Sequence, residues 1–330
     1  MTAVFSPGAR ARAGLLLSAA ALLLAGCAQL VPQTVGLRTD WPAGVPQTVE
    51  LTEVPFFPQE DYECGPAALA TVLVHTGVSV APETLAKQVF LPARKGSLQV
   101  EMIAAPRGYD RVTYQLAPKY TDLLREVAAG NPVIVLHDVG MFGTQWHYSV
   151  VNGFDYPSGT VYLRSGKDRR LEMPFTYFER TWIAGKYWSM VVVPPDRIPA
   201  TANENGWVNA VIAMARTSTP QAALTGYRTA LARWPDNVPA AIGLASVHQA
   251  RGETAQAITV LRSAQQRNPQ SAIVANNLAQ LLSDAGRHGE ALAALDRVGG
   301  DPQGPFAAEI RSTRQLILQR IDQQKSGNRK

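Results

Sequence analysis

The sequence is poor in cysteine and in charge, and each shortage excludes a class of protein. Only two of its 330 residues are cysteine, which excludes a small domain held together by disulfide bonds. Charged residues make up 17% and apolar residues 46%, a balance that excludes long-range disorder and favours about two globular domains. The apolar run from Ala13 to Leu24 is too short to span a bilayer as a free-standing helix.

Motifs for metal, nucleotide and nucleic-acid binding are also missing. The sequence has no HExxH, no paired CxxC and no phosphate-binding loop of the ATPase type, so we expect no metal, no other cofactor and no built-in ATPase. The net charge is +5, of which Arg10 and Arg12 supply two, and the remaining +3 does not indicate a nucleic-acid partner.

Residues 1–27 have the pattern of a secretory signal peptide. A basic segment without acidic residues precedes the apolar run, which ends in Leu24-Ala25-Gly26-Cys27. These four residues resemble the bacterial lipobox, whose cysteine is acylated, and several acyl chains on Cys27 would hold the protein at a membrane. Ala28 after it resembles the sorting signal for the outer membrane, on its periplasmic side, and residues 28–49 are expected to be a tether. The alternative is an uncleaved signal anchor with an incidental cysteine.

Once Cys27 carries lipid, Cys64 is the only thiol left in an exported protein. Pro66 suits the first turn of a helix, and the apolar run after it predicts a buried helix that begins at Cys64 and ends near Gly77. The free N–H groups of a helix N-terminus favour thiolate over thiol, and Gly65 would let a substrate backbone come close. The alternative is that Cys64 is only a small, buried apolar residue and not a nucleophile.

A nucleophilic cysteine needs an imidazole as its base, and the sequence offers five histidines. His75 lies about 16 Å along the same predicted helix, and two others fall in the C-terminal repeats described below. His147 opens a strand and can project from the end of a sheet, so we favour it. Two alternatives remain open: His137 is the base, or His147 is a structural core residue.

The segments around these residues resemble the papain-like peptidases that cut leader peptides after a double glycine, and their stand-alone relatives. The resemblance is carried by Gln59–Ala67 and Trp146–Asp155 and covers about residues 50–196. It implies an α+β papain-like fold in which Cys64 is the nucleophile and His147 the general base and then acid. It also implies that the Gln59 amide and the Cys64 N–H form the oxyanion hole, although Gln59 precedes Cys64 by five residues where transporter-linked members generally have six.

The same resemblance leaves the third catalytic residue in doubt. The family has Asp at the end of the strand after the histidine strand, where this sequence has Ser165. A serine hydroxyl accepts a hydrogen bond from imidazole but does not neutralise imidazolium as a carboxylate does. Asp168 is the alternative, because the register of the hairpin is not fixed by sequence, although a solvated turn residue is the simpler interpretation.

The C-terminal third repeats with a period of 34 residues. The repeated pairs are Pro235 and Pro269, Ala245 and Ala279, Gly252 and Gly286, Ala257 and Ala291, and Leu261 and Leu295. This period and placement of small residues resemble tetratricopeptide repeats, which are stacked helix hairpins. We expect an all-α solenoid over residues 203–322, with about three repeats and a capping helix over 306–322. It either binds a peptide in a concave groove or only braces the first domain.

Together these features predict a lipid-anchored periplasmic cysteine peptidase that acts on a peptide or protein substrate, with repeats that bind substrate or a protein partner. Two alternatives stay open. One is an amidase or transpeptidase on peptidoglycan stems that uses the same residues. The other is a non-catalytic peptide-binding adaptor in envelope assembly, which Ser165 favours.

Overall fold

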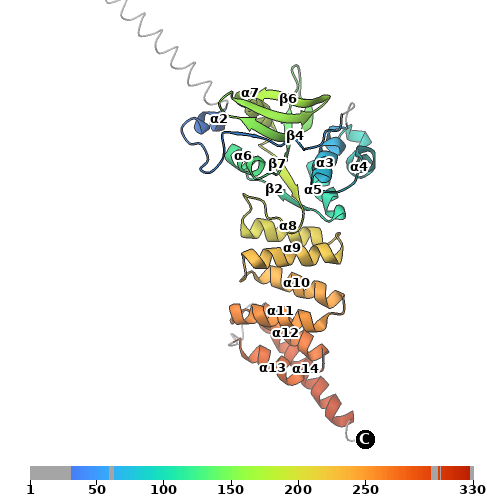
Figure 1. Cartoon of the computed structure of the whole chain (residues 1–330). Coiled ribbons are helices and arrows are strands. Elements are labelled where there is room, and N and C mark those ends of the chain that lie inside the picture. Colours follow the sequence, from blue (N-terminus) through green and yellow to red (C-terminus); the bar gives the residue numbers. More distant parts are fainter. Residues whose placement is uncertain (1–30, 59–62, 299–303, 305, 328–330) are drawn as a thin grey trace, which may run out of the picture. The chain divides into compact units, whose positions relative to one another are not determined.

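A computed structural model describes residues 31–58, 63–298, 304 and 306–327. The signal-peptide segment, Cys27 and Gln59 therefore lie outside the described residues. The chain divides into two compact units. The first holds the described residues up to Ala105, Gln115–Val192 and Pro199–Thr201, and the second holds Pro106–Tyr114, Val193–Ile198 and the described residues from Ala202 onward (Figure 1).

The first unit is built on an antiparallel sheet in the order β7-β3-β4-β5-β6, and β1 pairs with β4 as well. β2 spans the residues at which the two units divide. The strands are β1 Thr48–Glu50, β2 Val112–Gln115, β3 Val133–Asp138, β4 Trp146–Asp155, β5 Thr160–Ser165, β6 Asp168–Pro174 and β7 Ser189–Val193. β4 is the strand that positions the site, and it is buried along most of its length.

Three helices pack against this sheet: α3 Cys64–His75, α6 Tyr120–Ala128 and α7 Phe175–Ala184. The other helices before α6 are α2 Pro32–Leu37, α4 Pro82–Val89, η1 Pro92–Arg94, α5 Gln99–Ala104 and η2 Ala105–Tyr109, of which η2 spans a point where the two units divide. The helix α3 packs against β4, and α7 packs against β3. The core between them contains fully buried aromatic rings such as Phe178 and Trp182. Because the sheet alternates with helices that cover it, the α+β expectation for this domain is confirmed.

The second unit is a run of helices in which neighbours along the chain pack together (Figure 1). They are α8 Glu204–Ala215, α9 Pro220–Arg233, α10 Val238–Ala250, α11 Thr254–Arg267, α12 Ala272–Asp284, α13 His288–Asp296 and α14 Ala307–Gly327. Gly252 and Gly286, one period apart, both have a left-handed backbone, with φ of 75° and 74°. Glycine carries no Cβ penalty there, so the repeat in sequence is a repeat in backbone conformation. The last helix extends five residues beyond the predicted end at Asp322.

Among the described residues, no helix combines the length and the apolar character that a membrane span needs.

Candidate active site

Cys64 is the first residue of α3, as predicted. Pro66 lies in the first turn, where its missing N–H removes no helical hydrogen bond, and the helix ends at His75 just before Gly77, whose φ is 86°. Every residue from Gly65 to Leu73 is buried. The helix is therefore anchored along its length, and this anchoring fixes the position of the half-buried cysteine at its start.

The first residues of β4 lie beside Cys64. β5 pairs with β4 only from Val150 onward, so the first residues of β4 have no β5 neighbour among the described strand pairs. The main-chain N–H of Tyr148 donates a hydrogen bond to the Cys64 sulfur instead. This bond places the thiol beside the residue that directly follows His147.

Burial raises the pKa of the Cys64 thiol above its ordinary value. The main-chain N–H groups of Tyr148, Gly65 and Cys64 itself lower the pKa in part, but desolvation is the larger effect. The N–H groups at the start of the helix thus favour the thiolate, in the expected direction, but burial outweighs them. The sulfur is therefore a protonated thiol at neutral pH and needs a base.

Gly65 has a different role from the one expected. A Cβ at this position would lie 2.4 Å from Oγ and 2.7 Å from Cβ of Ser97, a residue just before α5. The space that a side chain at position 65 would occupy is thus filled by Ser97. The glycine lets the segment before α5 pack closely on the start of α3.

His147 lies near the start of β4, partly buried, and its Nε2 is 3.1 Å from Oγ of Ser165 at the end of β5. Its other ring nitrogen, Nδ1, makes no hydrogen bond with any described residue, so it is the nitrogen available to a thiol. Burial lowers the pKa of His147 to about 4, and the imidazole is neutral at neutral pH. A neutral imidazole with a free Nδ1 is a base.

His137, the alternative base, is unsuited to the task. It is fully buried, and both of its ring nitrogens are engaged: Nδ1 with Oγ1 of Thr181 at 3.1 Å and Nε2 with Oγ of Ser149 at 2.8 Å. Burial and the neighbouring His147 lower the pKa of His137 to about 3. It has no ring nitrogen left for the thiol.

Of the two candidates for the third residue, Ser165 is the one that contacts His147. Ser165 pairs with Asp168 across the turn between β5 and β6, but the Asp168 side chain is exposed. In the described structure Asp168 makes no contact with the imidazole. Gln59, the proposed oxyanion donor, lies outside the described residues, and its role stays a prediction.

Sequence analysis missed the polar residues behind Ser165. The Ser149 hydroxyl is 2.8 Å from the Ser165 hydroxyl, and it joins Ser165 to His137 and Thr181 inside the unit. A signal was present: His137 and Ser149 are polar residues in otherwise apolar strands, and His147 and Ser149 are two residues apart, which places them on one face of β4.

Exposed apolar side chains gather in the loop that leads to His147. Phe142 is fully exposed, Met141 is 83% exposed, and Trp146 directly precedes the histidine. Large apolar side chains concentrated on a surface loop often contact a ligand. This loop is the second feature that sequence analysis did not single out.

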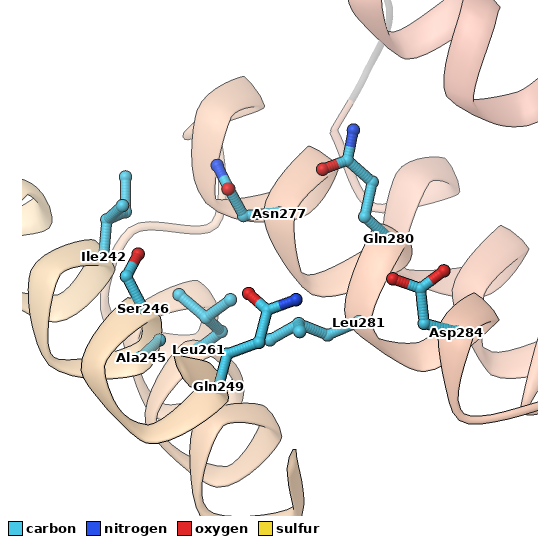
Figure 2. A pocket seen from close by; sticks show the side chains of 9 residues that line it. All are labelled: Ile242, Ala245, Ser246, Gln249, Leu261, Asn277, Gln280, Leu281 and Asp284. Atoms are coloured by element: carbon cyan, nitrogen blue, oxygen red, sulfur yellow. The ribbon is translucent and has the colours of Figure 1, made fainter. Parts of the chain in front are cut away.

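A hollow in the repeats is a separate candidate binding surface (Figure 2). Side chains of α10, α11 and α12 line it. The apolar lining residues are Ile242, Ala245, Leu261 and Leu281, and the polar ones are Ser246, Gln249, Asn277, Gln280 and Asp284.

Neither candidate surface resembles a metal centre. Among the described residues, no three of histidine, cysteine, aspartate and glutamate gather closely enough to hold a metal ion.

Comparisons with known proteins follow the division seen in the structure. Residues 51–190 match the Peptidase C39 like family, and residues 213–271 and 242–305 match tetratricopeptide repeats. The chain thus carries a Peptidase C39-like domain followed by tetratricopeptide repeats, which confirms both resemblances inferred from the sequence. A comparison of the sequence with curated proteins finds no match.

Solved structures similar to the chain include three related proteins. A Bacillus anthracis protein described as a C39-like peptidase is 19% identical, with a TM-score of 0.38, over 45% of this chain and 98% of its own. A double glycine motif protease from an AMS/PCAT transporter, in complex with the leader peptide, is 22% identical, with a TM-score of 0.34, over 45% and 99%. The peptidase domain of Streptococcus ComA, a bi-functional ABC transporter in a quorum-sensing pathway, is 20% identical, with a TM-score of 0.36, over 43% and 99%.

Proposed function

Because a Peptidase C39-like domain is followed by tetratricopeptide repeats, we propose that this chain is a cysteine peptidase that cleaves a peptide or protein substrate. One observation carries the proposal. The Cys64 sulfur accepts a hydrogen bond from the N–H of Tyr148, the residue after a neutral His147. Nε2 of that imidazole contacts Ser165, and Nδ1 makes no hydrogen bond with a described residue.

The reaction is acyl transfer. Nδ1 of His147 takes the thiol proton as Cys64 attacks the substrate carbonyl, and the imidazolium then gives that proton to the leaving amine. Water, deprotonated by the same imidazole, hydrolyses the thioester and releases the acid. The Cys64 N–H and the Gln59 amide stabilise the oxyanion, and one such donor is worth about 3 kcal/mol.

We further propose that the mature chain is held by lipid on Cys27 at the outer membrane, facing the periplasm. The supporting pattern is the lipobox behind a basic segment and an apolar run. The hollow lined by Asn277, Gln280 and their neighbours is the proposed contact for substrate or a protein partner.

Labelling with an electrophilic thiol probe tests the catalytic proposal without a known substrate. Wild type, Cys64→Ala and His147→Ala are treated across the pH range, with His288→Gln in the repeats as the control variant. We expect rapid labelling of wild type and the control, none of Cys64→Ala, and much slower labelling of His147→Ala at neutral pH. Labelling that is indifferent to His147 contradicts the proposal.

A non-catalytic peptide-binding adaptor is the second candidate. Two observations favour it: a hydroxyl stands where the family has a carboxylate, and burial raises the pKa of the Cys64 thiol. An adaptor would bind peptides equally well in wild type and Cys64→Ala and would release no cleaved product from a peptide library.

The anchor is tested separately. Cys27→Ser should move the protein from the membrane fraction to the soluble fraction of cells, while Cys64→Ser leaves it on the membrane. Unchanged fractionation of Cys27→Ser contradicts the lipid anchor and leaves the peptidase proposal intact.

A further inference from the structure

A line of hydrogen bonds runs from His147 into the first unit and ends on a main-chain carbonyl. It comprises His147 Nε2 to Ser165 Oγ at 3.1 Å, Ser165 Oγ to Ser149 Oγ at 2.8 Å, Ser149 Oγ to His137 Nε2 at 2.8 Å, His137 Nδ1 to Thr181 Oγ1 at 3.1 Å, and Thr181 Oγ1 to the Phe178 carbonyl at 2.9 Å. The serines and His137 join three neighbouring strands, and Thr181 belongs to α7.

The carbonyl sets the direction of the line. A carbonyl oxygen only accepts, so the Thr181 hydroxyl donates its single proton to Phe178. The Thr181 oxygen must then accept from His137, which requires the proton of that imidazole to lie on Nδ1. His137 is fully buried and neutral, since its pKa is about 3, and it carries only this one proton.

The same reasoning continues to the site. Nε2 of His137 has no proton, so it accepts from the Ser149 hydroxyl. The Ser149 oxygen then accepts from Ser165, and the Ser165 oxygen accepts from Nε2–H of His147. The neutral His147 ring is thereby protonated on Nε2, and the lone pair lies on Nδ1.

We propose that Thr181, His137 and Ser149 are positioning residues that fix the tautomer of His147, so that Nδ1 is the basic nitrogen of the site. The proposal rests on the proposed function, in which Nδ1 takes the Cys64 proton. In this chain the hydrogen-bonded line performs one task of the family's carboxylate, which is to hold the imidazole in the correct tautomer and orientation. None of the three residues touches the substrate or the sulfur.

The preference for the Nε2–H tautomer of His147 follows from the number of hydrogen bonds that each tautomer allows. With His147 protonated on Nδ1, every donor in the line would reverse, and Thr181 would donate to His137 and lose its bond to Phe178. One net hydrogen bond corresponds to a population ratio of about 5 to 1 in favour of the Nε2–H tautomer. Because four of the five side chains in the line are less than 9% exposed, water cannot easily supply a substitute donor.

Nitrogen-15 NMR of the histidine side chains measures the tautomers directly. Long-range proton–nitrogen correlations distinguish protonated from unprotonated ring nitrogens, and His147→Gln and His137→Gln spectra assign the two rings. In the purified wild-type chain at pH 7.5 we expect His147 protonated on Nε2 and His137 protonated on Nδ1. A wild-type His147 protonated on Nδ1 overturns the proposal without the need for any variant.

Thr181→Val removes the end of the line and keeps the side-chain shape. We expect the His147 tautomer ratio to fall about fivefold, towards equal populations, and Thr181→Ser to restore it. Thr113→Val is the matched control, because the Thr113 hydroxyl is buried and has no hydrogen-bond partner among the described residues. Ser149→Ala interrupts the line at a second point and should shift the ratio in the same way.

If the His147 tautomer ratio in Thr181→Val or Ser149→Ala equals the ratio in the Thr113→Val control, the proposal is overturned. Alkylation of Cys64 by iodoacetamide, measured on the same samples, separates this result from a failure of the proposed function. If wild type reacts no faster than His147→Ala, the peptidase proposal fails, and the tautomer ratios still decide whether the line sets the state of His147.

Discussion

Nε2 of His147 faces the hydroxyl of Ser165 at 3.1 Å, at the strand end where the resemblance in sequence implies a carboxylate. A neutral hydroxyl accepts a hydrogen bond from the imidazole N–H but adds no negative charge to the site. Consistent with this, burial lowers the pKa of His147 to about 4, and among the described residues no carboxylate opposes this shift. The site therefore rests as thiol and neutral imidazole, not as an ion pair.

Ser165→Ala should slow Cys64 alkylation and peptide hydrolysis about 10- to 100-fold. The reason is that a hydrogen bond to a charged group contributes about 1.5–3 kcal/mol, and the imidazolium formed during the reaction would lose it. Pre-steady-state kinetics of wild type and Ser165→Ala measure the loss. Ser158→Ala, in the exposed turn before β5, is the control, and equal rates for Ser165→Ala and this control would show that Ser165 has no part in the reaction.

The pH profile of Cys64 labelling should have its acid limb near pH 4. His147 acts only when unprotonated, and because its pKa in the folded chain is about 4 and not 6.5, the base remains available at pH 5.5. Direct reaction of the thiolate should add to the rate only at alkaline pH, since burial raises the pKa of Cys64. Labelling rates from pH 3.5 to 10 test this, and an acid limb at pH 6.5 or above would contradict it.

The sequence was sufficient to predict the helix that begins at Cys64 and the strand that opens at His147. These features depend on local signals: Pro66 in a first turn and apolar runs in the helix and the strand. The partner of His147 was left open between Ser165 and Asp168, because the register of the hairpin is not fixed by sequence. The protonation of Cys64 was not predictable, because it depends on how deeply the sulfur is buried. The role of Gly65 was missed for a similar reason, since Ser97 is distant in sequence and only the fold brings the two together.

Gly65→Ala should damage both the stability and the reactivity of the first unit. Its Cβ would overlap Cβ and Oγ of Ser97, and overpacking of this kind costs about 1–3 kcal/mol. Ser97→Gly should restore most of the loss, because the Ser97 hydroxyl is buried without a described partner and its removal breaks no hydrogen bond. Chemical denaturation measures the effect, with Gly36→Ala, which meets no atom within 4 Å, as control.

If Gly65→Ala proved as stable as Gly36→Ala, the close approach of Ser97 to α3 would not exist in solution. If Gly65→Ala lost stability and the double variant with Ser97→Gly did not recover it, the loss would come from another neighbour of the added Cβ. The nearest is Met102 Sδ at 3.2 Å.

Val211 and Gly226 show how the first repeat departs from the others. Val211 occupies the position of Ala245 and Ala279, which made the first copy look irregular in sequence. A Cβ on Gly226 would lie 2.9 Å from Val211 Cγ1, so the glycine on α9 compensates for the larger side chain on α8. One period on, the pair is Ala245 and Val260, with the large residue on the other helix.

Gly226→Ala should therefore destabilise the repeats by about 1–3 kcal/mol, despite the higher helix propensity of alanine. Val211→Ala in the same chain should recover part of that loss, because it removes the methyl group that the new Cβ would meet. Gly289→Ala, on an exposed helix position with no atom within 4 Å, should leave stability unchanged or raise it by up to about 1 kcal/mol. Thermal unfolding of Gly226→Ala, Val211→Ala, the double variant and Gly289→Ala measures the coupling between Val211 and Gly226, and strictly additive effects would show that the two side chains do not share this space.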